Sequence, residues 1–128
     1  MKAAQIEKYS KDINVSINEI AIPEPKDNEV LIKVKAAAVN PVDILIITGS
    51  IRLIQDYSMP LALGNECSGI VEKVGNKVKD FRIGDKVYTR LPINKIGAFA
   101  EYVTVAHDAV APMPAGYEFI SAAAIPLT

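Results

Sequence analysis

The sequence predicts a mainly β fold, a small barrel or sandwich with one short helix. Three observations support this: several short strand-like segments, frequent turns between them, and one well-formed helix start. The 128 residues suit a single domain, and that length can bury a core without disulfides or metal. Half of the residues are hydrophobic and 23% are charged, which is typical of a globular chain.

The first third of the chain predicts three strands. Residues 1–7 form the first, with Ala3 and Ile6 available for a core. A second strand is expected over 15–22, before a proline-rich break. Residues 29–39 show the clearest pattern, because apolar residues there recur at every second position, as one half-buried strand requires.

The next segment predicts a helix of about two turns. Asn40 can cap it, Pro41 suits its first position, and Asp43 lies at the positive end of its dipole. Gly49 is a natural stop.

The second half predicts short elements separated by turns. Residues 50–59 form an irregular surface loop, and 61–75 hold a strand. Gly64 and Gly69 are expected where backbones pass closely, and Gly75 and Gly84 in turns that need positive φ. The remaining expected elements are strands over 85–90, 98–106 and 109–114, and a helix over 121–125 capped by Ser121.

Charge and composition exclude several classes of partner. The formal net charge is −1, from 14 basic and 15 acidic residues, so no basic excess indicates nucleic acid. The apolar runs are far shorter than the roughly 20 residues of a membrane helix, and the N-terminus lacks the apolar core of a signal peptide. We expect a cytoplasmic protein.

Four segments, taken in order, resemble one family. They are residues 29–34 with Asn40-Pro41-Val42-Asp43, residues 64–75, residues 81–87, and residues 97–103 with 122–126. Together they resemble the N-terminal domain of medium-chain dehydrogenase/reductases of the quinone oxidoreductase type. The resemblance implies that residues 1–128 form one GroES-like, partly open β-barrel with one short helix and a helical C-terminus.

Zinc-containing members of this superfamily have a cysteine at the position of Asn40 and a histidine at that of Asn65, followed by a glutamate as Glu66 is here. Catalytic zinc needs thiolate or imidazole donors, so we expect no metal. Residues 89–97 lack the four cysteines of the family's structural zinc. The lone Cys67 and His107 are expected to be a buried strand residue and a surface or turn residue.

The zinc-free members reduce quinones or α,β-unsaturated carbonyls with NADPH. Resemblance therefore implies a domain that orients the substrate and hydrogen-bonds its developing oxyanion. Asn40 is the best candidate, donating to that carbonyl or to the nicotinamide carboxamide, with the helix cap as the alternative role. Asp43 orders the site or caps the helix, and capping is the favoured interpretation.

Four residues are expected at the substrate pocket: Leu45, Tyr57, Asn65 and Glu66. Leu45 stands where relatives commonly have a tyrosine, which makes the pocket apolar and favours a hydrophobic enone or quinone. Asn65 takes the space of the lost histidine, with Glu66 behind it. Tyr57 lies in a loop that either covers the entrance or simply packs, and packing is the favoured interpretation.

The family's Rossmann cofactor domain is expected to be absent, because no strand–Gly-x-Gly-x-x-Gly–helix unit occurs. Alone, the chain should bind no NADPH, turn over no substrate and be a monomer, since the family's homodimer forms chiefly through that domain. Two alternatives stay open: a non-catalytic GroES-like binding module, and a fragment of a zinc alcohol dehydrogenase.

Overall fold

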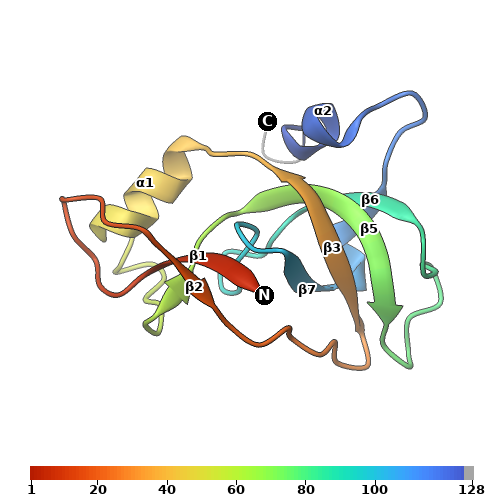
Figure 1. Cartoon of the computed structure of the whole chain (residues 1–128), viewed down its shortest axis with the longest axis horizontal. Helices are drawn as coiled ribbons and strands as arrows, with labels where there is room; N and C mark the ends of the chain where they lie inside the picture. The colour runs from red at the N-terminus through yellow and green to blue at the C-terminus, as the bar shows by residue number, and fades with distance from the viewer. Residues whose placement is uncertain (126–128) are drawn as a thin grey trace.

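The computed structural model describes residues 1–125, which form eight strands and two α-helices (Figure 1). The elements in order are β1 (Lys2–Ile6), β2 (Ser16–Glu19), β3 (Glu29–Ala37), α1 (Pro41–Thr48), β4 (Leu61–Ala62), β5 (Glu66–Val74), β6 (Lys86–Arg90), β7 (Tyr102–Ala106), the 3₁₀ turn His107–Ala109, β8 (Val110–Pro112) and α2 (Phe119–Ala123).

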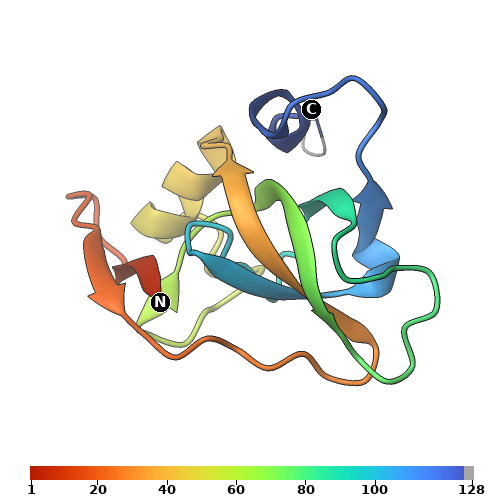
Figure 2. The ribbon, with the colours of Figure 1, turned by 45° about the vertical axis from the view of Figure 1, so that its right-hand side comes forward.

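Two antiparallel sheets organise these elements. The larger has the strand order β7-β3-β5-β6-β8, and the smaller has the order β2-β1-β4. The long strands β3 and β5 curve across the molecule, and register shifts in β3 accompany the bend (Figures 1 and 2). An isolated bridge between Ala3 and Ala100 joins the sheets. The prediction of a mainly β, partly open barrel with one short helix and a helical C-terminal segment is confirmed.

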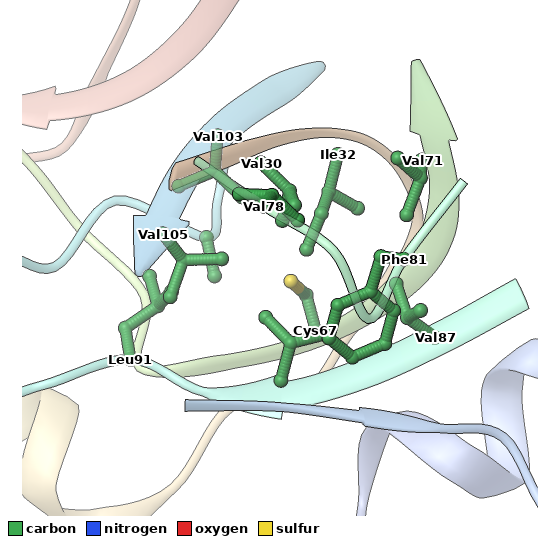
Figure 3. Packing of buried hydrophobic residues seen from close by; sticks show 12 residues of the cluster. Val30, Ile32, Cys67, Val71, Val78, Phe81, Val87, Leu91, Val103 and Val105 are labelled. Atoms are coloured by element: carbon green, nitrogen blue, oxygen red, sulfur yellow. The ribbon is translucent and has the colours of Figure 1, made fainter. Parts of the chain in front are cut away.

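The main hydrophobic core fills the concave side of the larger sheet (Figure 3). Cys67 lies there, fully buried, as expected for a lone strand cysteine. A second cluster lies beneath α1, where Ile46 and Ile47 pack against Ile6 of β1. This second cluster fixes α1 against the smaller sheet and so fixes the start of the helix.

The glycines were only partly predicted correctly. Gly84 has φ 96°, as predicted for a turn glycine. A Cβ on Gly64 would lie 2.6 Å from the backbone nitrogen of Phe99, as predicted for a close approach, and its φ is also positive at 105°. Gly75 does not have positive φ, so that expectation was wrong. Its real constraint is space, since a Cβ there would lie 2.1 Å from the carbonyl oxygen of Lys26.

Several element boundaries also differ from the prediction. Strand β7 begins at Tyr102 and not at residue 98, and β2 is shorter than the predicted 15–22. The strand expected over 61–75 is two strands, β4 and β5, because the backbone turns at Gly64. The C-terminal helix begins at Phe119, and Glu118 occupies the N-cap position, so Ser121 lies inside the helix and does not cap it. The predicted helical C-terminus also includes residues 126–128, which lie outside the described residues.

Candidate functional site

The site forms where β3 ends and β5 begins. The antiparallel register places Ala37 opposite Cys67, so the residues after β3 lie beside those before β5. Helix α1 starts immediately after Asn40. Sheet pairing and helix start therefore bring together four of the predicted residues: Asn40, Asp43, Asn65 and Glu66.

Asp43 connects the helix to the strand segment. One carboxylate oxygen, Oδ2, accepts a hydrogen bond from the backbone N–H of Asn40 at 2.7 Å, which is one half of a capping box. The other, Oδ1, accepts from the Asn65 side-chain amide at 2.7 Å. The predicted capping role is thus confirmed, and the same side chain also fixes Asn65.

Asn40 lies at the head of α1 and faces Glu66. Its amide nitrogen, Nδ2, donates to Glu66 Oε1 at 2.6 Å. The same nitrogen contacts the carbonyl oxygen of Ala38 at 3.4 Å, a long and weak interaction. One N–H of Asn40 is therefore held firmly, and the other has only a weak partner.

Three of the four residues in this hydrogen-bond network are deeply buried. Asp43 is 2% exposed, Asn65 3% and Glu66 0%, while Asn40 is partly exposed. Such burial in low dielectric strengthens charge-assisted hydrogen bonds and holds the amides in one orientation. Asn40 is consequently the member that a ligand can reach.

The donor set does not fit zinc. The two positions at which the resemblance places zinc ligands, Asn40 and Asn65, carry amides, and both amide nitrogens donate to carboxylates. Burial and the neighbouring Glu66 charge raise the pKa of the Cys67 thiol to about 12, so this cysteine supplies no thiolate. Within residues 1–125, no group of three or more His, Cys, Asp or Glu side chains could hold a metal ion.

The other two predicted pocket residues lie apart from this network. Leu45 is 44% exposed on the outer face of α1, beside the equally exposed Ile44. Tyr57 packs against the second hydrophobic cluster, and its hydroxyl donates to the carbonyl oxygen of Ile93. Loop packing thus accounts for Tyr57, whereas Leu53 of the same loop is fully exposed.

The pairing of Asn40 with Glu66 is a structural feature of the candidate site that the sequence pattern did not reveal. These residues are 26 positions apart and belong to different elements. The signal that could have found them is the register of β3 against β5, which follows only once those strands are paired. His107, by contrast, lies as expected at a surface turn, with Nδ1 3.0 Å from Asp80 Oδ1.

The helices of residues 1–125 include none with the length and apolar character needed to cross a bilayer.

A family model described as "Alcohol dehydrogenase GroES-like domain" matches residues 26–115.

Two sequence relatives are oxidoreductases named for quinones or for alkenals and alkenones. The quinone oxidoreductase of Sus scrofa is 43% identical over 108 residues, which cover 84% of this chain and 32% of that protein. The chloroplastic NADPH-dependent alkenal/one oxidoreductase of Arabidopsis thaliana is 38% identical over 116 residues, covering 86% of this chain and 30% of the relative.

Among solved structures, Escherichia coli quinone oxidoreductase complexed with NADPH superposes with a TM-score of 0.86 at 30% identity. The match covers 98% of this chain and 37% of the other. The chain therefore spans about a third of the length of the proteins it matches.

Proposed function

Since this chain belongs to the family of alcohol dehydrogenase GroES-like domains, we propose that it is the substrate-side domain of an NADPH-dependent reductase. The substrates would be quinones or α,β-unsaturated carbonyls, reduced without zinc. Support comes from relatives named for these two chemistries, a quinone oxidoreductase and an alkenal/one oxidoreductase.

The observation that carries the proposal is the amide–carboxylate network at the zinc-ligand positions. Asn40 and Asn65 are each locked by a buried carboxylate, Glu66 and Asp43 respectively. The weakly held N–H of Asn40 offers a hydrogen-bond donor there in place of a Lewis-acidic metal. The site is thus built to hold a polar group in a fixed direction.

Asn40 is the residue that we expect to hydrogen-bond the substrate. In this reaction NADPH, when bound, would supply a hydride, and negative charge would gather on the substrate oxygen. The weakly held N–H of Asn40 can leave the Ala38 carbonyl and donate to that oxygen, or to the nicotinamide carboxamide. Glu66 keeps the other N–H fixed, so the amide cannot turn its oxygen toward the substrate.

Asp43 and Asn65 act behind Asn40. Asp43 holds the backbone N–H of Asn40 and the side chain of Asn65 with the same carboxylate. The exposed apolar face of α1 at Leu45 would contact the hydrophobic part of the substrate. Tyr57 would contribute only at the rim, because its hydroxyl already serves the Ile93 carbonyl.

Two alternatives predict different observations. A non-catalytic GroES-like module would assemble into a closed ring, which sedimentation would reveal. A zinc alcohol dehydrogenase fragment would carry one tightly bound zinc per chain, which metal analysis would reveal. Location in the cytoplasm stays a prediction, because one relative is named as chloroplastic.

The proposal can be tested by joining residues 1–128 to the cofactor domain of the porcine quinone oxidoreductase. In this chimera, Asn40→Ala should lower kcat for a quinone by roughly 100-fold with a smaller change in KM, because an oxyanion donor acts mainly in the transition state. Asn76→Ala, an exposed asparagine in a turn, is the matched control. An unchanged kcat in a folded Asn40→Ala chimera would remove Asn40 from the reaction.

A further inference from the structure

Strand β2 is the open edge of the smaller sheet. Among the described residues, 1–125, it pairs only with β1, in the order β2-β1-β4, and Figure 2 shows it as the outermost strand of that sheet. The backbone N–H of Ile20 donates to the carbonyl oxygen of Met1. Because backbone groups alternate in direction along a strand, the N–H and C=O of Val15 and Ile17 point away from β1, toward solvent.

Three apolar side chains follow this edge. Ile13 is 54% exposed, Val15 40% and Ile17 67%. They alternate with polar residues, so in an extended chain they share one face. An exposed apolar row beside unpaired backbone groups is a template for another strand.

The segment is self-complementary. Read in both directions from Val15, its residues match in kind: Asn14 with Ser16, Ile13 with Ile17, and Asp12 with Asn18. At the two ends stand Lys11 and Glu19, which have opposite charges. An antiparallel copy in this register therefore places each lysine at the glutamate of the other chain, which is a favourable cross-strand pairing.

We propose that two copies of this chain associate through antiparallel pairing of residues 13–19 about a two-fold axis at Val15. The register makes Val15 face Val15 of the second copy, and Ile13 face Ile17 of the second copy. Val15 and Ile17 direct their backbone groups outward, and Ile13 does so when residues 13–15 extend β2, so each pair can exchange two hydrogen bonds. The smaller sheet becomes a continuous six-stranded sheet, two copies of the three strands of one chain.

The charged ends complete the contact. Lys11 lies in a bend, so its long side chain and not its backbone reaches the second copy. Glu19 is 71% exposed on its side chain and also pairs with the amino terminus of its own chain at 3.3 Å. The surface area buried by so short a strand pairing is well below the roughly 1,200 Å² that a stable interface buries, so the dimer is weak and concentration-dependent. It replaces the monomer expected from the sequence and is independent of the proposed catalytic role.

A proline tests the backbone part of the proposal. Val15 lies just before the β1–β2 ladder, which begins at Ser16, so Val15→Pro removes an outward N–H without breaking an internal bond. Sedimentation velocity over a concentration series should show the unaltered chain and Val15→Ile moving toward dimer, and Val15→Pro remaining monomeric. A monomer at all concentrations for the unaltered chain, or an unaffected dimer for Val15→Pro, would overturn the proposal.

Cysteine cross-linking tests the register. Val15→Cys places two thiols across the axis, with Cα atoms about 5.5 Å apart, within the range of about 4.4–6.8 Å that a disulfide spans. Ile13→Cys places its two thiols roughly 13 Å apart along the strand, too far to join. The native Cys67 is buried and does not interfere.

We expect Val15→Cys to form a covalent dimer at least about tenfold faster than Ile13→Cys under mild oxidation. The double variant Ile13→Cys with Ile17→Cys should cross-link as fast as Val15→Cys. Equal rates for the two single variants would show random collision, and faster linkage through Ile13→Cys would show another register. Either result would refute the pairing about Val15.

Discussion

A single carboxylate, that of Asp43, holds the start of α1 to the segment before β5. Removing it leaves two buried donors, the Asn40 backbone N–H and the Asn65 amide, without their partner. We expect Asp43→Ala to lower the free energy of unfolding by about 2–4 kcal/mol, since a helix cap and a buried charge-assisted bond are lost together. Urea unfolding measures the change.

The control for this variant is Asp12→Ala. Asp12 is exposed in the loop before β2, and its removal should change the free energy of unfolding by less than about 0.5 kcal/mol. Equal losses for Asp12→Ala and Asp43→Ala would mean that the network contributes nothing specific to stability.

The helix cap in this site could be predicted from single residues and their immediate neighbours, whereas Asn65 and Glu66 were expected only from the family resemblance. The cap at Asn40 and Asp43 follows from local sequence, because capping needs residues only three positions apart. The partner of Asn40 could not be predicted in this way. Glu66 reaches it only through the pairing of β3 with β5, which is set by the whole sheet.

At the scale of elements, β3 and β5 approach so closely that only glycine fits at Gly69. A Cβ there would lie 2.2 Å from the carbonyl oxygen of Lys33, a backbone atom that cannot turn away. Gly69→Ala should therefore cost at least about 3 kcal/mol of stability or prevent folding. Thermal unfolding followed by circular dichroism measures the loss.

Gly84 provides the contrast. It has φ 96°, but no atom of residues 1–125 lies within 4 Å of a Cβ added there, so Gly84→Ala should cost only about 1 kcal/mol of backbone strain. A Gly69→Ala variant as stable as Gly84→Ala would show that the two strands can separate at this point.

An ion pair joins the start of β3 to the loop after β6. Burial tends to raise the pKa of Glu29, but hydrogen bonds from Lys95 and the Lys26 backbone, with both lysine charges, outweigh burial and lower the pKa. A carboxyl group whose pKa is lower in the folded protein than in the unfolded protein stabilises the fold at pH values above its unfolded-state pKa. That stabilisation is lost as pH falls through the folded pKa.

Lys95→Met should consequently remove about 1 kcal/mol at neutral pH, and it should weaken the dependence of stability on pH in the acidic range. Urea unfolding from neutral to acidic pH, with the exposed Lys77→Met as control, gives both quantities. A Lys95→Met profile parallel to that of the unaltered chain would show that Glu29 gains nothing from this lysine.

The order and type of elements could be predicted because alternation, capping and turn residues are local signals. Contacts between segments distant in the sequence could not be predicted from these local signals. Gly75 was assigned to a turn with positive φ, yet it is required because the Lys26 carbonyl approaches it from another segment. The helix at the C-terminus was placed two residues late, since Ser121 offered a cap that the chain does not use.

At the scale of the whole molecule, two sheets and a short helix build one wall of a site and place Asn40 at its accessible end. The chain spans about a third of the length of the relatives it matches. The proposed substrate site and the open β2 edge use different elements, which lets the proposed dimer and the proposed chemistry be tested separately.

The most direct test of the central claim is the rate of NADPH oxidation by the chimera with a quinone or an enone, measured with and without a strong zinc chelator. We expect turnover with either acceptor, an unchanged rate in the chelator, and no oxidation of a primary alcohol in the reverse direction. A folded, NADPH-binding chimera that reduces neither acceptor, or that loses its activity to the chelator, would contradict a zinc-free reductase domain.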